Sequence, residues 1–185
     1  GQFVEVSILG VGEAPISISS SPSRSHGTFE LCVRRAGSLT QVMHSLQAGD
    51  QLGIRGPFGH GFPIERFRGK DMLFRPGGLG LAPLRSLINE VLDDRANFGR
   101  VLLLYGARTP ADLLFRQELE AWERRDDVEL FLTVDRGDPS WQGNVGVITT
   151  LFPKIHVHPR NTIAVTCGPP VMHRFVLMEM QAKGI

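Results

Sequence analysis

The hydrophobic pattern of this sequence changes its period near residue 70, and this change limits what the chain can fold into. Beyond residue 70, four apolar runs contain no polar alternation, which is typical of strands buried on both faces of a parallel sheet. The runs cover residues 72–74, 101–105, 130–134 and 162–166. Stretches with helical spacing separate them, so the pattern predicts a doubly wound α/β sheet with right-handed crossovers.

Three helices are expected between these strands and after the last one. The apolar residues that mark them are, in chain order, Leu84, Leu87, Ile88, Val91 and Leu92; Phe115, Leu119 and Trp122; and Val171, Phe175 and Met178. Pro83 suits the first turn of the first helix, and Pro169 and Pro170 open the third.

Before residue 70 the apolar residues alternate with polar ones, as in strands with one buried face. The alternating residues are Val4, Val6 and Ile8, followed by Phe29, Leu31 and Val33. Turns rich in glycine, serine and proline separate these stretches, so a small antiparallel β-barrel is expected. Because the first residue already stands in a strand-like pattern, we expect the barrel to be incomplete at its N-terminus. The sequence therefore predicts two domains, residues 1–68 and residues 69–185.

The composition argues against several classes of partner. Lys and Arg number 20 against 19 Asp and Glu, so the net charge of +1 gives no reason to expect nucleic acid. No apolar run approaches the roughly 20 residues of a membrane-spanning helix, and the N-terminus lacks a signal-peptide pattern. The two cysteines, Cys32 and Cys167, lie far apart and suggest no disulfide framework, so a reducing cytoplasm is the expected location.

Three strand ends suit a dinucleotide, because ligands of open parallel sheets bind at the carboxyl ends of the strands. At the first, Gly77, Gly78 and Gly80 precede a helix and let the backbone approach a pyrophosphate near free N–H donors. The spacing GGxG differs from the GxGxxG of Rossmann folds. A glycine-rich turn without a ligand is the alternative interpretation.

The next strand ends offer groups for the rest of a nucleotide. Arg108 can contact phosphate or ribose, while Thr109 suits a helix cap before Pro110. Asp135 would accept hydrogen bonds from ribose hydroxyls, which favours NAD, whereas the adjacent Arg136 favours NADP.

The last strand end carries Cys167, Gly168 and Pro169. A small polarisable side chain beside a Gly-Pro turn would line a flat ring such as nicotinamide. A buried cysteine before a helix is the alternative.

Two segments of the first half also stand out, residues 14–20 and residues 37–40. Backbone groups and hydroxyls near Thr40 would hold a second pyrophosphate if a helix starts there. Ordinary loops rich in serine and glycine are the alternative for both segments. His156 and His158 are interpreted as surface residues rather than metal ligands, and no metal site is predicted.

Taken together, these segments resemble the ferredoxin–NADP reductase superfamily over essentially the whole chain. The shared order is a flavin barrel, Gly-Pro-Phe-Gly at 56–59, the glycine turn with Pro83, Tyr-Gly-Ala-Arg at 105–108 and Cys-Gly-Pro-Pro at 167–170. Residues 12–20 and 132–135, with Trp141 and Gly143, most resemble one branch. That branch contains gamma subunits of sulfhydrogenase-type NiFe hydrogenases, the second subunit of anaerobic sulfite reductase and the dihydroorotate dehydrogenase electron-transfer subunit.

The resemblance implies FAD in the first domain and NAD, or NADP, in the second. The residues that it assigns to FAD are Pro15, Ile16, Ser17, Cys32, Val33, Arg34, Leu39 and Thr40. The residues that it assigns to the nicotinamide dinucleotide are Gly77, Gly78, Gly80, Pro83, Arg108, Asp135, Cys167, Gly168 and Pro169. As residues of the catalytic centre, Ser17 is expected near flavin N5 and Cys167 beside the nicotinamide.

The sequence departs from the family at two places. The family's flavin-binding Arg-x-Tyr-Ser falls on residues 14–17, where only Ser17 is retained, so a phosphate clamp and a stacking ring are lost. Small or aliphatic residues usually precede the glycine turn, but here Arg75 and Pro76 do. Proline removes an N–H and is expected to weaken the phosphate loop.

The resemblance also implies an activity, hydride transfer between the nicotinamide and FAD followed by single-electron release to iron–sulfur centres. The expected partners are the iron–sulfur and catalytic subunits of a hydrogenase or sulfite reductase complex. Relatives continue into a segment whose four cysteines hold a [2Fe–2S] cluster, and those cysteines are absent from this chain. The alternatives are an electron-transfer subunit of a dihydroorotate dehydrogenase, a flavin-free nucleotide-sensing or docking module, and a plain single-domain dehydrogenase.

Overall fold

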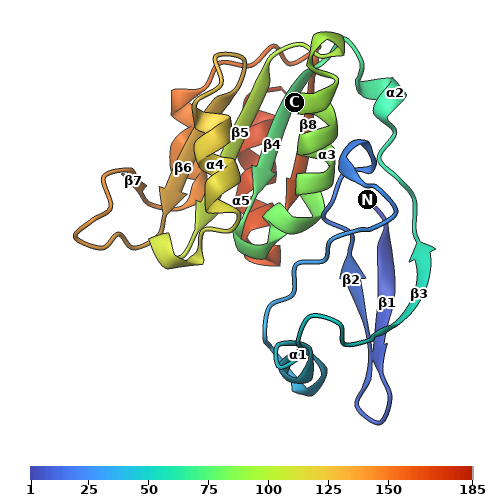
Figure 1. Ribbon diagram of the computed structural model, residues 1–185. Helices are drawn as coiled ribbons and strands as arrows, with labels where there is room; N and C mark the ends of the chain where they lie inside the picture. Colours follow the sequence, from blue (N-terminus) through green and yellow to red (C-terminus); the bar gives the residue numbers. More distant parts are fainter. Residues whose placement is uncertain (185) are drawn as a thin grey trace.

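The computed structural model describes residues 1–184, which form two sheets with their attached helices (Figure 1). The first sheet has three antiparallel strands in the order β2-β1-β3, with bounds β1 (Phe3–Ile8), β2 (Gly12–Ser17) and β3 (Gly53–Phe58). The second sheet has five parallel strands in the order β7-β6-β5-β4-β8. Its strands are β4 (Asp71–Pro76), β5 (Val101–Ala107), β6 (Glu129–Val134), β7 (Asn144–Val145) and β8 (Thr162–Cys167). This is the expected fold class, an antiparallel β domain followed by an α/β domain.

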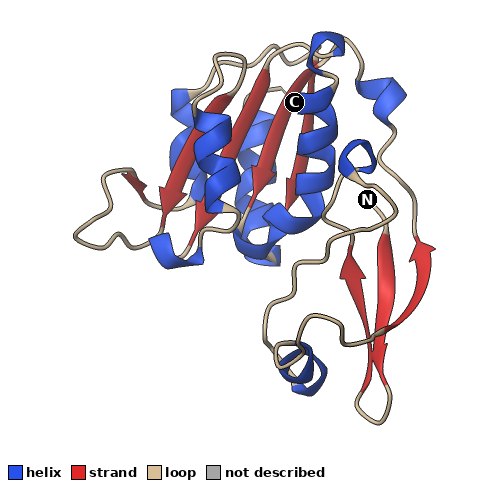
Figure 2. Cartoon of the chain, viewed as in Figure 1, coloured by secondary structure: helices blue, strands red, loops and turns tan. Residues whose placement is uncertain are grey.

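The parallel sheet is covered by helices on both faces (Figure 2). The helices are α3 (Leu81–Asp93), α4 (Arg116–Glu123) and α5 (Pro170–Ala182), and the 3-10 helix η5 (Ile148–Lys154) also covers the sheet. One apolar cluster joins alternate residues of β4 and β5 to α3 and α4. The other joins Leu73, Leu102 and Leu104 of these strands to η5 and α5. Every residue of β4 is buried, which explains why its sequence shows no polar alternation.

The three expected helices are present, but α5 turns a different side to the sheet than its spacing suggests. Val171, Phe175 and Met178 mark this helix correctly, yet they are 68%, 53% and 59% exposed. Val176 is the fully buried residue of α5. Phe115 lies one residue before α4, in a left-handed conformation with φ of 51°. Among residues 1–184, no helix has the length and apolar character that crossing a membrane requires.

The antiparallel sheet is smaller, and one expected strand does not form. Val4 and Val6 of β1 are buried, as their alternation predicts. The prediction of a strand at Phe29, Leu31 and Val33 is wrong, because this segment makes only an isolated bridge between Leu31 and Ile18. Glu30, in the middle of the segment, instead binds a residue of α3 in the second domain.

Three short helices complete the first domain. They are α1 (Ser38–Met43), α2 (Ile64–Phe67) and the 3-10 helix η1 (Pro22–Arg24). In Figure 1 the strands of the parallel sheet point downward, and α1 lies below the ends to which they point. The first domain therefore extends toward the carboxyl ends of the second domain's strands.

Candidate functional site

The topological switch point of the parallel sheet lies between β4 and β8. The chain leaves β4 toward β5 on one side, and β8 returns later to pair with β4 on the other. Pro76 and Cys167 are register partners at the carboxyl ends of these two strands. The backbone N–H of Gly77 donates to the Cys167 carbonyl at 2.8 Å. Two sequence-predicted residues, Gly77 and Cys167, therefore meet where open α/β sheets bind their ligands.

The glycine turn, residues 77–80, presents backbone donors at this point. Gly78 and Leu79 begin the 3-10 helix η2 (Gly78–Gly80), which continues directly into α3. The first N–H groups of such a helix have no intrahelical acceptor and lie at the positive end of the helix dipole. Gly78 has φ of +53°, and a Cβ on it would meet nothing within 4 Å. The geometry therefore fits a phosphate group, which can approach the backbone closely here.

Gly80 serves a different purpose from the one its position in the motif suggests. A Cβ on Gly80 would not point at a ligand but would overlap the carbonyl oxygen of Cys167, and it would lie 2.9 Å from Gly168 N. The absence of a side chain therefore lets the start of α3 touch the end of β8. Pro83 follows in the first turn of α3, as expected.

The ends of β5 and β6 lie side by side at the same edge. The N–H of Asp135 donates to the Ala107 carbonyl at 2.9 Å, and both Asp135 and Arg108 are exposed. Thr109 is the N-cap residue of the 3-10 helix η4 (Pro110–Asp112), where the Asp112 carboxylate accepts from its N–H at 3.1 Å and from its hydroxyl at 2.7 Å. The predicted cap is therefore present, and Arg108 and Asp135 stay free to contact a nucleotide.

Cys167 and Cys32 are free and half-buried. Burial raises the pKa of both thiols above the usual range. They are therefore protonated near neutral pH and are not activated nucleophiles. Gly168 and Pro169 follow Cys167 and lead into α5, where the Gly168 carbonyl lies 3.1 Å from His173 Nε2. A small neutral side chain before a turn suits the lining of a ring-binding surface.

The first turn of α1 forms a second phosphate-compatible site. Thr40 Oγ1 accepts from the N–H groups of Ala36 and Gly37 at 2.8 and 2.9 Å and donates to the Gly37 carbonyl at 3.0 Å. Its hydroxyl therefore shapes the turn, and the adjacent Leu39 side chain is buried. The N–H groups of Ser38 and Leu39 stay available, and Arg34 is exposed nearby in sequence. This donor set fits the pyrophosphate of a flavin nucleotide.

Pro15, Ile16 and Ser17 occupy the end of β2, paired with β1. Pro15 is exposed, whereas Ile16 and Ser17 are half-buried. Val33, further along, is held by His44, whose Nε2 lies 2.9 Å from its carbonyl oxygen. Among residues 1–184, no hydrogen bond joins Ser17 to Cys167, so the two residues expected at the catalytic centre make no direct polar contact.

Tyr105 links the glycine turn to the loop that precedes α4. Its side chain is fully buried, and its hydroxyl donates to the Gly78 carbonyl at 3.2 Å and accepts from Leu114 N–H at 3.1 Å. Burial raises the pKa of Tyr105 to about 12. Cys32 stands two positions after Glu30, which binds Arg85 of α3, the helix that follows the glycine turn.

Replacing Tyr105 by phenylalanine is expected to lower the free energy of unfolding by about 1–2 kcal/mol, because the buried N–H of Leu114 loses its acceptor. The Gly78 carbonyl loses a donor in the same variant, so the turn should bind nucleotide several-fold more weakly. Denaturant unfolding and nucleotide titration measure the two effects. Unchanged stability would show that this hydroxyl does not hold the turn.

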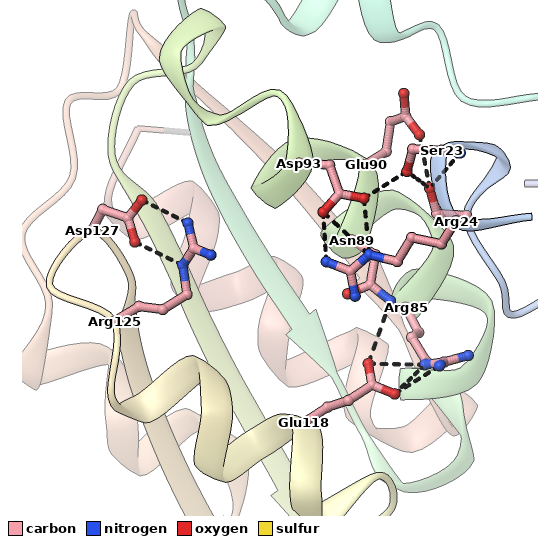
Figure 3. Close-up of polar contacts among 10 residues, drawn as sticks. Ser23, Arg24, Arg85, Asn89, Glu90, Asp93, Glu118, Arg125 and Asp127 are labelled. Atoms are coloured by element: carbon pink, nitrogen blue, oxygen red, sulfur yellow. Dashed lines mark hydrogen bonds and ion pairs between the residues drawn. The ribbon is translucent and has the colours of Figure 1, made fainter.

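Arg85 of α3 joins the two domains, and Figure 3 shows its contact with Glu118 of the second domain. Its Nε lies 2.8 Å and 3.0 Å from the two carboxylate oxygens of Glu118 in α4, and its Nη1 binds Glu30 and, at 3.3 Å, the Ser19 carbonyl. Its guanidinium lies 4.6 Å from the ring centroid of Phe115. Burial opposes the charge, but the hydrogen bonds to Glu118 and Glu30 outweigh it and raise the pKa of Arg85.

A second set of contacts docks η1 onto α3 (Figure 3). The Arg24 guanidinium binds the Asp93 carboxylate at 2.6–3.2 Å, and Ser23 Oγ donates to the same group at 2.7 Å. Ser21 Oγ donates to Glu90 at 2.8 Å. The hydrogen bond from Arg24 lowers the pKa of Asp93. Sequence reasoning missed these residues because the partners stand about seventy positions apart and share no motif.

A cavity of about 410 Å³ lies between the domains behind these contacts. Phe29, Phe62 and Leu87 are among its lining residues. None of the predicted cofactor residues lines it, so it is separate from the glycine turn. Within residues 1–184, no three His, Cys, Asp or Glu side chains gather as metal ligands would.

The sequence matches two domain families, one in each half. Residues 1–62 match the oxidoreductase FAD-binding domain, and residues 76–177 match the oxidoreductase NAD-binding domain. Sulfhydrogenase 1 subunit gamma of Pyrococcus furiosus is 44% identical over 179 residues, which are 95% of this chain and 61% of that protein. A probable dihydroorotate dehydrogenase B (NAD(+)) electron transfer subunit of Methanothermobacter thermautotrophicus is 36% identical over all of this chain and 63% of its own length. The chain thus spans somewhat less than two thirds of these relatives.

Solved structures agree with this assignment. The cytochrome b5 reductase domain of Ulva prolifera nitrate reductase superposes with a TM-score of 0.82 at 25% identity. The superposition covers 100% of this chain and 80% of that domain. The paired sheets and the loop that joins them are therefore shared with a known reductase fold.

Proposed function

Because this chain belongs to the FAD- and NAD-binding oxidoreductases of the ferredoxin–NADP reductase type, we propose that it is the diaphorase part of an electron-transfer subunit. It would move electrons between NADH and the iron–sulfur centres of a multisubunit enzyme of the hydrogenase or sulfite reductase type. The identity to a sulfhydrogenase gamma subunit favours this kind of complex. We assign residues 1–68 to the flavin domain and residues 69–185 to the dinucleotide domain.

One observation carries this proposal, the meeting of the two cofactor segments at the carboxyl edge of the sheet. The turn at Gly77 and Gly78 lies at the switch point and leads into α3, where Arg85 binds Glu30, two positions before Cys32. Ligands bound by the two segments would thus lie close together. Proximity of this kind is what a reaction between two bound cofactors requires.

The residues present have distinct roles in this scheme. When bound, NADH and FAD supply the hydride transfer and the change from two-electron to one-electron chemistry. The N–H groups of Gly78 and Leu79 would hold the dinucleotide pyrophosphate, and Arg108 would contact its phosphate or ribose. Asp135 would accept from the adenine ribose and repel a 2′-phosphate, which favours NAD over NADP. Cys167 and Gly168 would line the nicotinamide ring.

The flavin domain has its own set of roles. The N–H groups at the start of α1 and the Arg34 guanidinium would hold the FAD pyrophosphate, with Thr40 keeping the turn in shape. Cys32 and Val33 would contact the flavin through their half-buried segment. Ser17 would donate a hydrogen bond to the flavin ring. No protein acid or base is needed, which agrees with the neutral thiol of Cys167.

Anaerobic titration with NADH tests the activity. A full-length chain reconstituted with FAD should lose its visible flavin absorbance with about one equivalent of NADH, because hydride carries two electrons. NADPH serves as the matched control and should act at higher concentration, because Asp135 disfavours its 2′-phosphate. A flavin-loaded sample that stays yellow with NADH would contradict the proposal.

Two alternatives make different predictions. A dihydroorotate dehydrogenase subunit would share these cofactor residues and differ in partner, so copurification distinguishes it. A flavin-free docking module is suggested by Ala14 and Ile16, which offer neither a cation nor a stacking ring. Such a module would bind NADH but stay colourless after FAD reconstitution. We propose a cytoplasmic location, because both cysteines are free thiols.

A further inference from the structure

Arg75, the penultimate residue of β4, has a charged side chain that is buried without a partner among the described residues. Its relative exposure is 0%, and its Nε, Nη1 and Nη2 have no hydrogen-bond partner among the described residues. The nearest favourable contact is the ring of Phe152, whose centroid lies 5.6 Å from the guanidinium carbon. Burial lowers the pKa of Arg75 to about 10, so the group is still charged at neutral pH. An unpaired buried charge is strongly unfavourable unless something compensates for it.

Arg75 precedes the glycine turn in the chain and is fully buried. Arg75 and Gly77 are two positions apart, so the Arg75 side chain leaves the face of the sheet toward which a Cβ on Gly77 would point, and the two Cα atoms are about 7 Å apart. This is the face covered by α5, because a Cβ on Gly77 would overlap Met172 of that helix. Thr166, the register partner of Arg75, donates its hydroxyl to the Arg75 carbonyl at 3.0 Å and not to its guanidinium. Nothing else in the described residues neutralises the guanidinium.

We propose that Arg75 is an affinity-determining residue that supplies positive potential to the pyrophosphate site at Gly77–Leu79. This inference rests on the proposed function, because it assumes that a dinucleotide pyrophosphate binds at the turn. A charge enclosed by apolar side chains acts through a low dielectric and is little screened by salt. Arg75 therefore attracts the anion through the protein interior while the backbone N–H groups bind it directly.

The proposal predicts that one substitution has opposite effects on stability and binding. Arg75→Met keeps an unbranched side chain and removes the charge. In the absence of nucleotide, it should raise the melting temperature by about 3–8 °C, because a buried unpaired charge is lost. It should also weaken binding of ADP-ribose about tenfold, because the pyrophosphate loses the attraction. A merely structural residue would not separate the two measurements in this way.

The experiment uses the full chain with FAD bound. ADP-ribose is the probe, because it carries the pyrophosphate but cannot reduce the flavin, and calorimetry gives its dissociation constant. Arg174→Met is the matched control, because Arg174 is an exposed arginine of α5. It should change neither binding nor melting. Arg75→Lys, measured at about pH 6 to keep the ammonium charged, should bind within about threefold of the unmodified chain.

The outcomes separate this inference from the proposed function. Failure of the unmodified chain to bind ADP-ribose would contradict the dinucleotide site itself. Binding to Arg75→Met with unchanged affinity would overturn the role of Arg75 alone. Equal losses in Arg75→Met and Arg75→Lys would also overturn it, because shape rather than charge would then explain the effect. If Arg75→Met does not fold, the lysine variant decides.

Discussion

Replacing Gly80 by valine is expected to lower the free energy of unfolding by about 3–4 kcal/mol and to abolish nucleotide binding. A Cβ at this position would overlap the Cys167 carbonyl oxygen and lie 2.5 Å from its carbon. These are backbone atoms fixed by the hydrogen bond from Gly77, so they cannot move aside as a side chain would. The start of α3 would have to leave β8, and the turn between them would lose its shape.

Chemical denaturation and ADP-ribose titration measure the two effects of Gly80→Val. Gly61→Ala is the matched control, because a Cβ there meets no atom within 4 Å. It should leave both quantities nearly unchanged. A Gly80→Val protein with ordinary stability would show that α3 can begin further from β8 than the structure has it.

Replacing Arg85 by methionine is expected to cost about 2–4 kcal/mol of stability and to slow flavin reduction by NADH about 10²-fold. The Arg85 side chain is only 12% exposed and holds Glu118 of one domain and Glu30 of the other. Its loss leaves a partly buried carboxylate unpaired and frees the flavin domain to shift. Small displacements of bound rings slow a transfer between them steeply.

Stopped-flow reduction of the FAD-loaded protein and denaturant unfolding measure the effects of Arg85→Met. Arg125→Met provides the control, because its ion pair with Asp127 is 36% and 40% exposed and lies within one domain (Figure 3). Exposed pairs of this kind contribute at most about 1 kcal/mol. Equal effects of the two substitutions would mean that Arg85 does not position the domains.

The sequence is sufficient to predict those features that depend on local pattern. The apolar run 72–74 of β4 reflects burial on both faces, and the spacing from Leu84 to Leu92 reflects the one buried face of α3. The glycine turn is also predictable, because strand, glycines and helix follow one another directly. Its location at the switch point follows from topology alone.

Features that depend on distant contacts cannot be predicted in this way. The alternation at Phe29 and Val33 predicts a strand, but Glu30 between them forms an ion pair with Arg85, 55 positions away. The apolar spacing of α5 identifies a helix without saying which side packs, because Val176 and the exposed Phe175 are adjacent. The motif indicates that Gly80 is necessary, but the atom that requires it belongs to Cys167. Such requirements become visible only in three dimensions.

The apolar core is divided unequally between the two domains. Among the described residues, the buried apolar side chains of the first domain are Val4, Val6 and Leu39, and all the others belong to the second. The flavin side thus derives much of its order from the contacts of η1 and Glu30 with α3. Damage to that contact would loosen the flavin pocket while the parallel sheet stays intact. A variant could then look well folded by its helix content and still be unable to keep its coenzyme.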